Sequence, residues 1–261
     1  MVTISVAVTG ATGKLGSVAV RLIEAAADLE LVAALDSSTP LEAMVGADVL
    51  LDVTLPRVSP DIVTYALAEG LNVLVGTSGW SAERIAALRT SLSDEQGVII
   101  VPNFSIGSAL ATSFAAAASR FFDSVEIVEA HRATKVDSPS GTAVRTAELI
   151  GEARSALGPV VAPHTDQRAR GQRVSSVPIH SLRLQGLVAR QEVLLGAAGE
   201  TLSIVHNTLD STSYEAGILV ALRACATATG ITVGLENLID LTGTAGPAHR
   251  EQATSGGDTA Q

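Results

Sequence analysis

Residues 129–142, EAHRATKVDSPSGT, combine the side-chain types needed to hold a small anion and to protonate it. His131, Arg132 and Lys135 place three basic side chains within five positions, although the whole chain carries a formal net charge of -10. Histidine exchanges a proton near neutral pH, and arginine and lysine bind carboxylates or phosphates. This stretch therefore predicts a general acid beside an anion-binding patch.

The end of the same stretch predicts the start of a helix. Ser140 is a suitable N-cap, and the backbone N–H groups of Gly141 and Thr142 then have no helical acceptor. A helix start beside Lys and Arg side chains can hold a carboxylate or phosphate. We expect an acidic small substrate here, protonated by His131 or Lys135 while a hydride arrives. The alternative is a solvated basic turn in front of a capped helix.

A glycine-bearing turn, VTGATGKLGS, follows the first predicted strand and precedes a predicted helix, as in dinucleotide-binding proteins. Gly10 permits a tight turn, Gly13 lets the backbone approach a pyrophosphate, and Gly16 allows the helix to pack on the strand. The N–H groups at the helix start would face the phosphates. The spacing is G-x-x-G-x-x-G rather than the strict G-x-G-x-x-G, so a turn without a ligand is the alternative.

The second predicted strand ends before Asp36, twenty residues beyond Gly16. An acid at this place accepts hydrogen bonds from the adenosine ribose hydroxyls. No arginine follows Asp36 to receive a 2′-phosphate, so NADH is favoured, although Lys14 can still attract NADPH. Turns at 76–80 and 101–104 follow two further predicted strands and are expected near the nicotinamide, ordinary strand-to-helix linkage being the alternative.

Apolar runs alternate with helical patterns through the first hundred residues, which predicts βαβ units and a parallel sheet. The expected strands are 4–8, 31–35, 49–53, 73–75 and 98–101, and the expected helices are 14–27, 60–69 and 81–92.

The pattern changes after Pro102, where strands become longer and follow each other closely. The expected elements are helices at 108–121, 141–156 and 213–229, strands at 124–130, 177–184, 186–196 and 200–207, and a long loop at 157–175. Short breaks between the last three strands predict an antiparallel meander.

The predicted fold class is α/β, with a Rossmann-like dinucleotide-binding domain and an α+β domain. The second domain has a mixed or antiparallel sheet, and a partner subunit could cover one face of that sheet. The expected domain bounds are 1–104 with 214–242 for the first domain and 105–213 for the substrate-binding and oligomerisation domain, with a disordered tail at 243–261.

Composition excludes several classes of function. A pI near 4.9 argues against a nucleic-acid partner. No apolar run reaches the roughly 18 residues that span a bilayer, and the N-terminus has no signal-peptide pattern. The single cysteine, Cys225, excludes an internal disulfide, suits a reducing cytoplasm and is expected to pack in the core. No metal site is expected.

These motifs occur in order in a known family. The chain resembles the 4-hydroxy-tetrahydrodipicolinate reductases, also called dihydrodipicolinate reductases, of lysine and diaminopimelate synthesis, and is most similar to the actinobacterial form. The resemblance runs from about Val6 to Leu241. Its most specific part is E-x-H-x-x-x-K-x-D-x-P-S-G-T at 129–142, supported by GATGKLG, GTSGW, VPNFSIG, FFDSVEIVE and GLVARQEVLLG.

The resemblance implies that NADH or NADPH reduces a cyclic, unsaturated dicarboxylate in a cytoplasmic homotetramer. It identifies His131 as the proton donor and Lys135 as a second donor and substrate contact. Arg132 and the stretch Ser140, Gly141 and Thr142 would bind the substrate. The implied cofactor contacts are Gly10, Ala11, Thr12, Gly13, Lys14, Leu15, Asp36, Gly76, Thr77, Ser78, Val101, Pro102, Asn103 and Phe104.

Several residues near the implied substrate site depart from the family pattern. Arg132 stands where the family usually has a second histidine, and Leu55, Trp80 and Arg190 also differ. One alternative is therefore a paralogous imine or enamine reductase that acts on a related cyclic imino acid in another pathway. Another is a non-catalytic NAD(P)-binding regulator, although such a protein would not need the proton donors.

Overall fold

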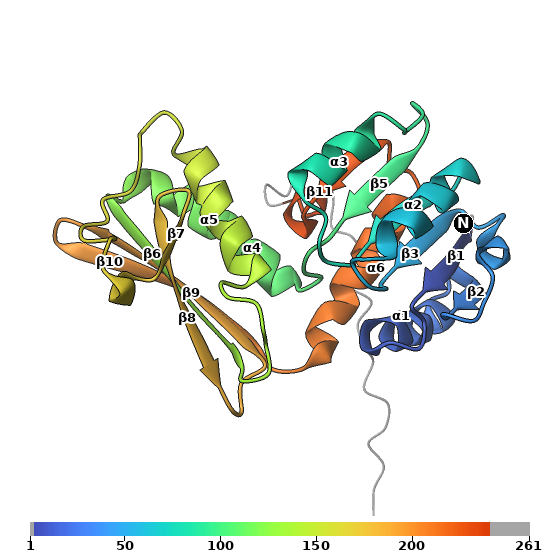
Figure 1. Ribbon diagram of the computed structural model, residues 1–261, viewed down its shortest axis with the longest axis horizontal. Coiled ribbons are helices and arrows are strands. Elements are labelled where there is room, and N and C mark those ends of the chain that lie inside the picture. The colour runs from blue at the N-terminus through green and yellow to red at the C-terminus, as the bar shows by residue number, and fades with distance from the viewer. Residues whose placement is uncertain (1–2, 241–261) are drawn as a thin grey trace, which may run out of the picture.

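The computed structural model describes residues 3–240 and folds into two lobes, each built around a sheet (Figure 1). The strands of the first sheet are β1 (Ile4–Thr9), β2 (Leu29–Leu35), β3 (Val49–Asp52), β4 (Asn72–Val75), β5 (Gly97–Ile100) and β11 (Gly230–Val233). Their order is β11-β5-β4-β3-β1-β2, and every neighbouring pair is parallel. The parallel sheet predicted for the first half is confirmed.

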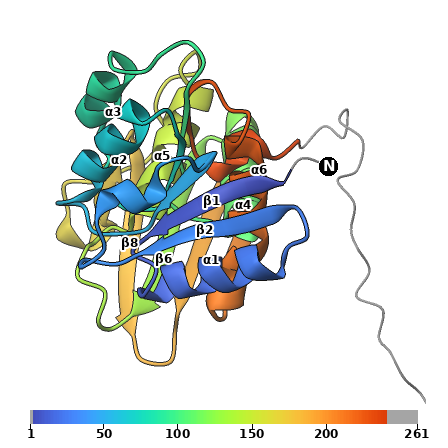
Figure 2. The ribbon, with the colours of Figure 1, turned by 90° about the vertical axis from the view of Figure 1, so that its right-hand side faces the viewer.

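Helices cover both faces of this sheet (Figure 2). They are α1 (Lys14–Ala25), α2 (Ser59–Ala68), α3 (Ala82–Arg89) and α6 (Glu215–Cys225), with short 3-10 helices at Leu41–Met44, Ser211–Tyr214 and Leu235–Leu238. One apolar core joins α1 and α6 to the sheet, and a second core joins α2 and α3 to the opposite face. Strands buried on both faces explain the continuous apolar runs in the sequence.

The direction of strand addition reverses at β1, which has β2 on one side and β3 on the other. In open α/β sheets, ligands bind outside the carboxyl ends of the strands at such a point. Gly10 follows β1 with a φ of +77°, and a Cβ there would lie 2.6 Å from the Val53 carbonyl oxygen. A Cβ on Gly16 would lie 2.1 Å from the Gly10 oxygen. Both glycines thus allow the close approach that the sequence predicted.

The second lobe contains α4 (Ile106–Ala118), α5 (Gly141–Ala153) and a second sheet. Its strands are β6 (Ser124–Arg132), β7 (Gln172–Val174), β8 (Val177–Leu184), β9 (Ala189–Ala197) and β10 (Glu200–Thr208), in the order β10-β9-β6-β8-β7, with 3-10 helices at Ser119–Phe121 and Arg168–Arg170. Val125 and Ile127 of β6, with Val193 and Leu195 of β9, pack against the helices. The mixed sheet of the predicted fold class is confirmed.

The predicted antiparallel meander is confirmed for β9 and β10 and is wrong for β8. β6 lies between β8 and β9, and β8 runs parallel to β6, while β9 is antiparallel to both β6 and β10. In this central place, the inward side chains of β6 such as Val125 and Ile127 are completely buried. Closeness in the sequence predicted a hairpin between β8 and β9 that does not form.

Several predicted bounds also change. The predicted loop at 157–175 contains β7, a three-residue edge strand too short to show a period. The predicted helix at 213–229 ends at Cys225, and the chain then returns to the first sheet as β11 beside β5. The domain bounds themselves stay a prediction, and the predicted tail at 243–261 lies outside the described residues.

Cys225 is completely buried in the core between α1 and α6, as expected, and burial raises the pKa of its thiol. Within residues 3–240, no helix has the length and apolar character needed to cross a membrane. The same part of the chain holds no group of three or more His, Cys, Asp or Glu side chains that could bind a metal ion.

Candidate active site

One cleft of about 780 Å³ is lined by residues from both lobes. The start of α1 contributes Lys14 and Leu15, and the segment between β6 and α5 contributes Thr134, Lys135, Val136 and Asp137. Of the predicted site residues, the cleft brings together Lys14, Leu15, Gly76, Pro102, Asn103, Phe104, His131, Arg132, Lys135 and Thr142. Side chains predicted for cofactor and for substrate therefore share one space.

The other predicted site residues do not line this cleft, and they are Gly10, Ala11, Thr12, Gly13, Asp36, Thr77, Ser78, Val101, Ser140 and Gly141. The backbone N–H groups of Gly10 and Ala11 donate to the Leu35 oxygen, at 3.0 and 3.1 Å, and that of Gly13 donates to Gly10. These three amides hold the shape of the turn. The N–H groups at the start of α1 have no helical acceptor and are the ones suited to a phosphate.

Asp36 is exposed at the end of β2 and is held by its own turn. Its Oδ1 accepts hydrogen bonds from the backbone and hydroxyl of Ser38, at 2.9 and 2.7 Å, and from those of Thr39, at 3.1 and 3.0 Å. These bonds, led by the Ser38 hydroxyl, lower the pKa of Asp36 to about 2. Asp36 is therefore a fixed anion with a defined orientation.

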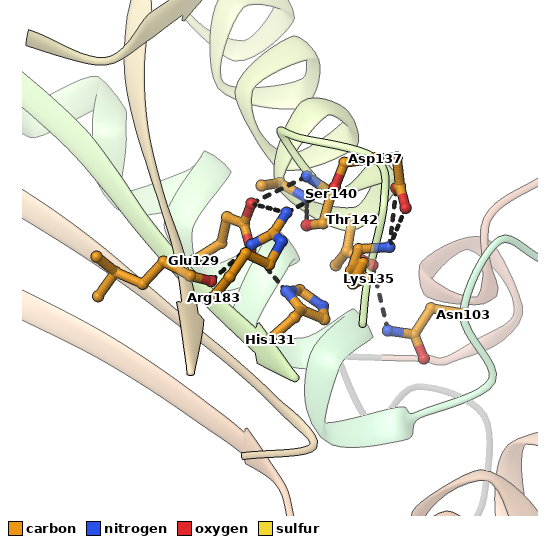
Figure 3. Close-up of polar contacts among 10 residues, drawn as sticks. Asn103, Glu129, His131, Lys135, Asp137, Ser140, Thr142 and Arg183 are labelled. Carbon is orange, nitrogen blue, oxygen red and sulfur yellow. Dashed lines mark hydrogen bonds and ion pairs between the residues drawn. The ribbon is translucent and has the colours of Figure 1, made fainter. Parts of the chain in front are cut away.

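His131 lies near the end of β6 (Figure 3) and lines the cleft. Its Nδ1 lies 2.6 Å from Glu129 Oε2. Burial lowers the pKa of His131, although the Glu129 carboxylate acts in the opposite direction and favours the charged ring. Burial thus favours the neutral imidazole, and a further anion beside the ring would favour the protonated form.

Lys135 follows a turn in which its backbone N–H donates to the Arg132 oxygen, at 3.0 Å. Its Nζ lies 2.8 Å from both carboxylate oxygens of Asp137. The hydrogen bond from Lys135 is the main reason why the pKa of Asp137 is lowered. Lys135 is therefore paired within its own loop while it lines the cleft.

The start of α5 has the predicted cap. The Ser140 hydroxyl accepts a hydrogen bond from the Ala143 backbone N–H, at 3.2 Å. Gly141 and Thr142 then occupy the first two helical positions, whose N–H groups have no helical acceptor. Ser140 and Thr142 line a small cavity beside the cleft together with His131.

Sequence reasoning gave no role to Glu129, although it lies in the quoted motif. The side chain is completely buried and contacts His131, the Ser140 backbone and both terminal nitrogens of Arg183 (Figure 3). A signal was present, because residues two apart on a strand face the same side. Glu129 and His131 therefore had to point together. The partner Arg183, on β8, had no such signal.

His206 was also missed. It projects from β10 into the small cavity that His131 lines, and its Nε2 lies 3.1 Å from the Ser105 hydroxyl. Burial lowers the pKa of His206. The alternation of ETLSIVHN predicts its strand, but the pairing of β10 with β9 was needed to place it near the site.

Of the residues that depart from the family pattern, Arg132 lines the cleft, whereas Leu55 and Trp80 do not. Trp80 is instead linked to strand β3 by two successive hydrogen bonds. Its Nε1 donates to the Ser59 hydroxyl, at 3.0 Å, and that hydroxyl donates to the completely buried Asp52. Arg190 lines the small cavity beside the cleft and forms an ion pair with a neighbour on β9. Of these departures from the family pattern, Arg132 and Arg190 are therefore the two that lie at the cleft or at the small cavity beside it.

Comparisons with known proteins agree with this arrangement. Residues 4–104 match the family model for the N-terminus of dihydrodipicolinate reductase, and residues 107–239 match the model for its C-terminus. The chain is 61% identical to 4-hydroxy-tetrahydrodipicolinate reductase of Clavibacter michiganensis, over 92% of this chain and 88% of the relative. It is 49% identical to the enzyme of the same name from Streptomyces coelicolor, over 90% and 98%.

Solved structures give the same result. A dipicolinate-bound dihydrodipicolinate reductase from Paenisporosarcina sp. TG-14 is 31% identical, with a TM-score of 0.77, over 91% of this chain and 100% of that chain. A myo-inositol 2-dehydrogenase from Lactobacillus plantarum, at 14% identity and a TM-score of 0.60 over 90% and 93%, shares the fold alone. With both halves matched in order, the chain belongs to the dihydrodipicolinate reductase family.

Proposed function

We infer that the protein is an NAD(P)H-dependent 4-hydroxy-tetrahydrodipicolinate reductase, forming tetrahydrodipicolinate in lysine and diaminopimelate synthesis. The observation that best supports this function is the shared cleft, which is lined both by the start of α1 and by His131, Lys135 and Thr142. The family and the names of the relatives from Clavibacter michiganensis and Streptomyces coelicolor support the same reaction.

The residues present fit a dinucleotide. The start of α1 offers free N–H groups beside Lys14, and Asp36 presents a fixed anion for the ribose hydroxyls. When bound, NADH or NADPH supplies a hydride. NADH is favoured because the Asp36 carboxylate would repel a 2′-phosphate. The remaining contacts come from the turns at 76–78 and 101–104.

A dianionic substrate fits the opposite wall. The N–H groups of Gly141 and Thr142 would hold one carboxylate, with Ser140 fixing the turn, while Arg132 and Lys135 supply positive charge. His131 donates a proton to the reduced substrate, and Lys135 serves as a second donor. A bound NADH or NADPH would supply the hydride, these side chains would supply the proton, and the 4-hydroxyl group of the substrate would leave as water.

Arg132 supports a second candidate, reduction of a related cyclic imino acid in another pathway. Arginine is larger than histidine and always charged, so it changes the shape of the cleft wall that it lines. Arg132→His should raise kcat/KM for 4-hydroxy-tetrahydrodipicolinate relative to other cyclic imines if this candidate is right. Unchanged selectivity would count against it.

The reductase is proposed to act as a cytoplasmic homotetramer. On the sheet face that α4 and α5 leave uncovered, large apolar side chains are exposed, namely Leu182, Leu184, Leu194 and Val205. The strand register places all four on this outer face, because residues at even positions of β8 and β9 and odd positions of β10 share it. A second sheet of the same kind would bury them.

The direct test is oxidation of NADH and NADPH, followed by nicotinamide absorbance. Dihydrodipicolinate synthase, pyruvate and aspartate semialdehyde would generate the substrate in the cuvette. We expect rapid oxidation that depends on the synthase. Tight binding of both nucleotides without turnover would overturn the proposed substrate and leave the dinucleotide site intact.

A further inference from the structure

Glu129 contacts both His131, the candidate acid, and the start of α5, the candidate carboxylate site. Its Oε2 lies 2.6 Å from His131 Nδ1 and 2.9 Å from Arg183 Nη1. Its Oε1 lies 3.0 Å from Arg183 Nη2 and 3.2 Å from the Ser140 backbone nitrogen. One completely buried carboxylate thus holds the imidazole with one oxygen and the start of α5 with the other (Figure 3).

We propose that Glu129, clamped by Arg183, is a positioning residue that fixes the tautomer of His131 and joins it to the substrate-binding helix start. The proposal deepens the proposed function and rests on it. His131 would be the catalytic residue, and Glu129 would act through it.

The tautomer follows from the chemistry of the contact. An ionised carboxylate only accepts hydrogen bonds, so Nδ1 of His131 must carry a hydrogen to satisfy Glu129. The proton that His131 gains and loses is then on Nε2. A carboxylate in this place also makes the ring more basic, as it does for catalytic and metal-bound histidines. Glu129 therefore selects which ring nitrogen can serve as the acid.

Arg183 keeps this carboxylate ionised. Burial alone would raise the pKa of Glu129, but the hydrogen bonds led by Arg183 outweigh burial and lower it. The same guanidinium donates to the Asp137 backbone oxygen, at 2.6 Å. Arg183 thereby also fixes the loop in which Asp137 holds Lys135. A single clamp sets the positions of both candidate proton donors.

The charged groups around His131 come from several elements. Lys135 and Arg183 both favour the neutral ring, whereas Glu129 favours the charged ring. His206 of β10 and Arg190 of β9 line the small cavity that His131 shares. Because Glu129 is the anion in this group that contacts the ring, its removal should lower the proton affinity of His131 rather than raise it.

A second carboxylate on β6 provides a matched control. Glu126 also contacts a histidine, with Oε2 2.7 Å from His180 Nε2, and an arginine, Arg170. It faces the opposite side of the sheet, because it is an odd number of residues from Glu129. Glu126, His180 and Arg170 line neither the cleft nor the small cavity beside it. The same chemistry is thus present away from the site.

The first test measures the His131 ring in the unsubstituted protein and uses a variant only to assign its signals. Nitrogen chemical shifts of the full chain, labelled with ¹⁵N in histidine, report the tautomer, and His131→Asn identifies the His131 signals among the five histidines. We expect neutral His131 to carry its hydrogen on Nδ1. A neutral ring with its hydrogen mainly on Nε2 would overturn the proposal.

The second test is titration of His131 in Glu129→Gln, with Glu126→Gln as control. Loss of the anion should lower the pKa of His131 by about one to three units, the usual effect of a charge at contact distance. Glu126→Gln should leave it unchanged. A purely structural role would lower the thermal midpoint and leave the titration as in the wild type. If Glu129→Gln fails to fold, the tautomer measurement decides.

Kinetics separate this inference from the proposed function. With an active wild type, Glu129→Gln should lower kcat by about ten- to a hundred-fold, as loss of such a supporting group does, and raise KM through the loosened Ser140 turn. Glu129→Asp, which keeps the charge, should recover part of kcat. An inactive wild type would reject the proposed substrate, while an active Glu129→Gln with unchanged kcat and His131 titration would reject this inference.

Discussion

Asn103 donates a hydrogen bond from Nδ2 to the Thr142 hydroxyl, 3.3 Å away, and so joins the turn after β5 to the start of α5. The Asn103 amide is held in place, because Nδ2 also donates to Ser108 Oγ at 3.1 Å and Oδ1 accepts from the Ser105 backbone N–H at 2.9 Å. The proposed cofactor turn and the proposed substrate site are therefore in direct contact.

We expect Thr142→Val to weaken this connection while preserving the shape of the side chain. A net hydrogen bond contributes about 1 kcal/mol, which corresponds to a loss of about five-fold in kcat/KM. Thr146→Val, one turn further along α5, removes a buried hydroxyl that contacts Thr112, Gln191 and the Thr142 backbone oxygen but not Asn103. It should lower the midpoint of urea unfolding with kcat/KM unchanged. Equal kinetic losses in both variants would contradict the connection.

His131→Asn and Lys135→Met should each lower kcat by about a hundred-fold or more, the range of general acid catalysis. His180→Asn is the control, since His180 also contacts a carboxylate, Glu126, but lies on the outer face of the same sheet and outside the cleft. Stopped-flow and steady-state oxidation of the nicotinamide would measure the effect. Near-normal turnover in both cleft variants would remove the proposed roles.

The pH dependence should differ between free and saturated enzyme. Burial puts the pKa of His131 below its ordinary value of 6.5, and the protonated ring is the active form. Hence kcat/KM should fall as the pH rises through that lowered pKa. A bound dianion raises the pKa of a nearby histidine, so kcat should persist to higher pH. Both profiles between about pH 5 and 8 would test this, and coincident profiles would contradict it.

Asp36→Ala should change cofactor choice rather than overall fold. Loss of the fixed anion removes charge-assisted hydrogen bonds to the ribose and the repulsion of a 2′-phosphate, so kcat/KM for NADH should fall about ten-fold relative to NADPH. Asp48→Asn is a suitable control, because Asp48 contacts Ser5 at the opposite end of β1. If the ratio of kcat/KM for NADH to kcat/KM for NADPH is the same in Asp36→Ala as in the wild type, Asp36 does not face the ribose.

Leu194→Glu should disrupt the proposed tetramer. Leu194 is 38% exposed on the outer face of the second sheet, where a second copy would bury it. Light scattering should change from a mass of four 26.6 kDa chains to a smaller assembly. Phe121→Glu is the control, since Phe121 is 80% exposed but lies in the short helix after α4. A monomeric wild type would exclude the tetramer outright.

The first lobe could be predicted from sequence because its central strands are buried on both faces. Runs such as 73–75 and 98–101 are apolar throughout, and helical patterns separate them, which leaves a parallel sheet as the simple solution. The glycine turn was also predictable, because its glycines are needed by the backbone itself. At Gly10 and Gly16 a side chain would collide with backbone atoms.

The second lobe was harder because strand pairing there is set by packing between distant segments. The order β9-β6-β8 puts residues 124–132 between two strands that follow each other in the sequence. The role of Arg183 depends on the same pairing, since β8 must lie beside β6 before its guanidinium can reach Glu129. Local patterns cannot reveal such contacts.

The return of the chain to the first sheet affects the order of folding during synthesis. β11 pairs with β5, so the edge of β5 stays open until residue 233 has left the ribosome, long after residues 97–100. An open strand edge invites pairing with other chains. The whole second lobe is synthesised in that interval. A nascent chain stalled before β11 would therefore present an open strand edge at β5 beside a second lobe whose residues have all been synthesised.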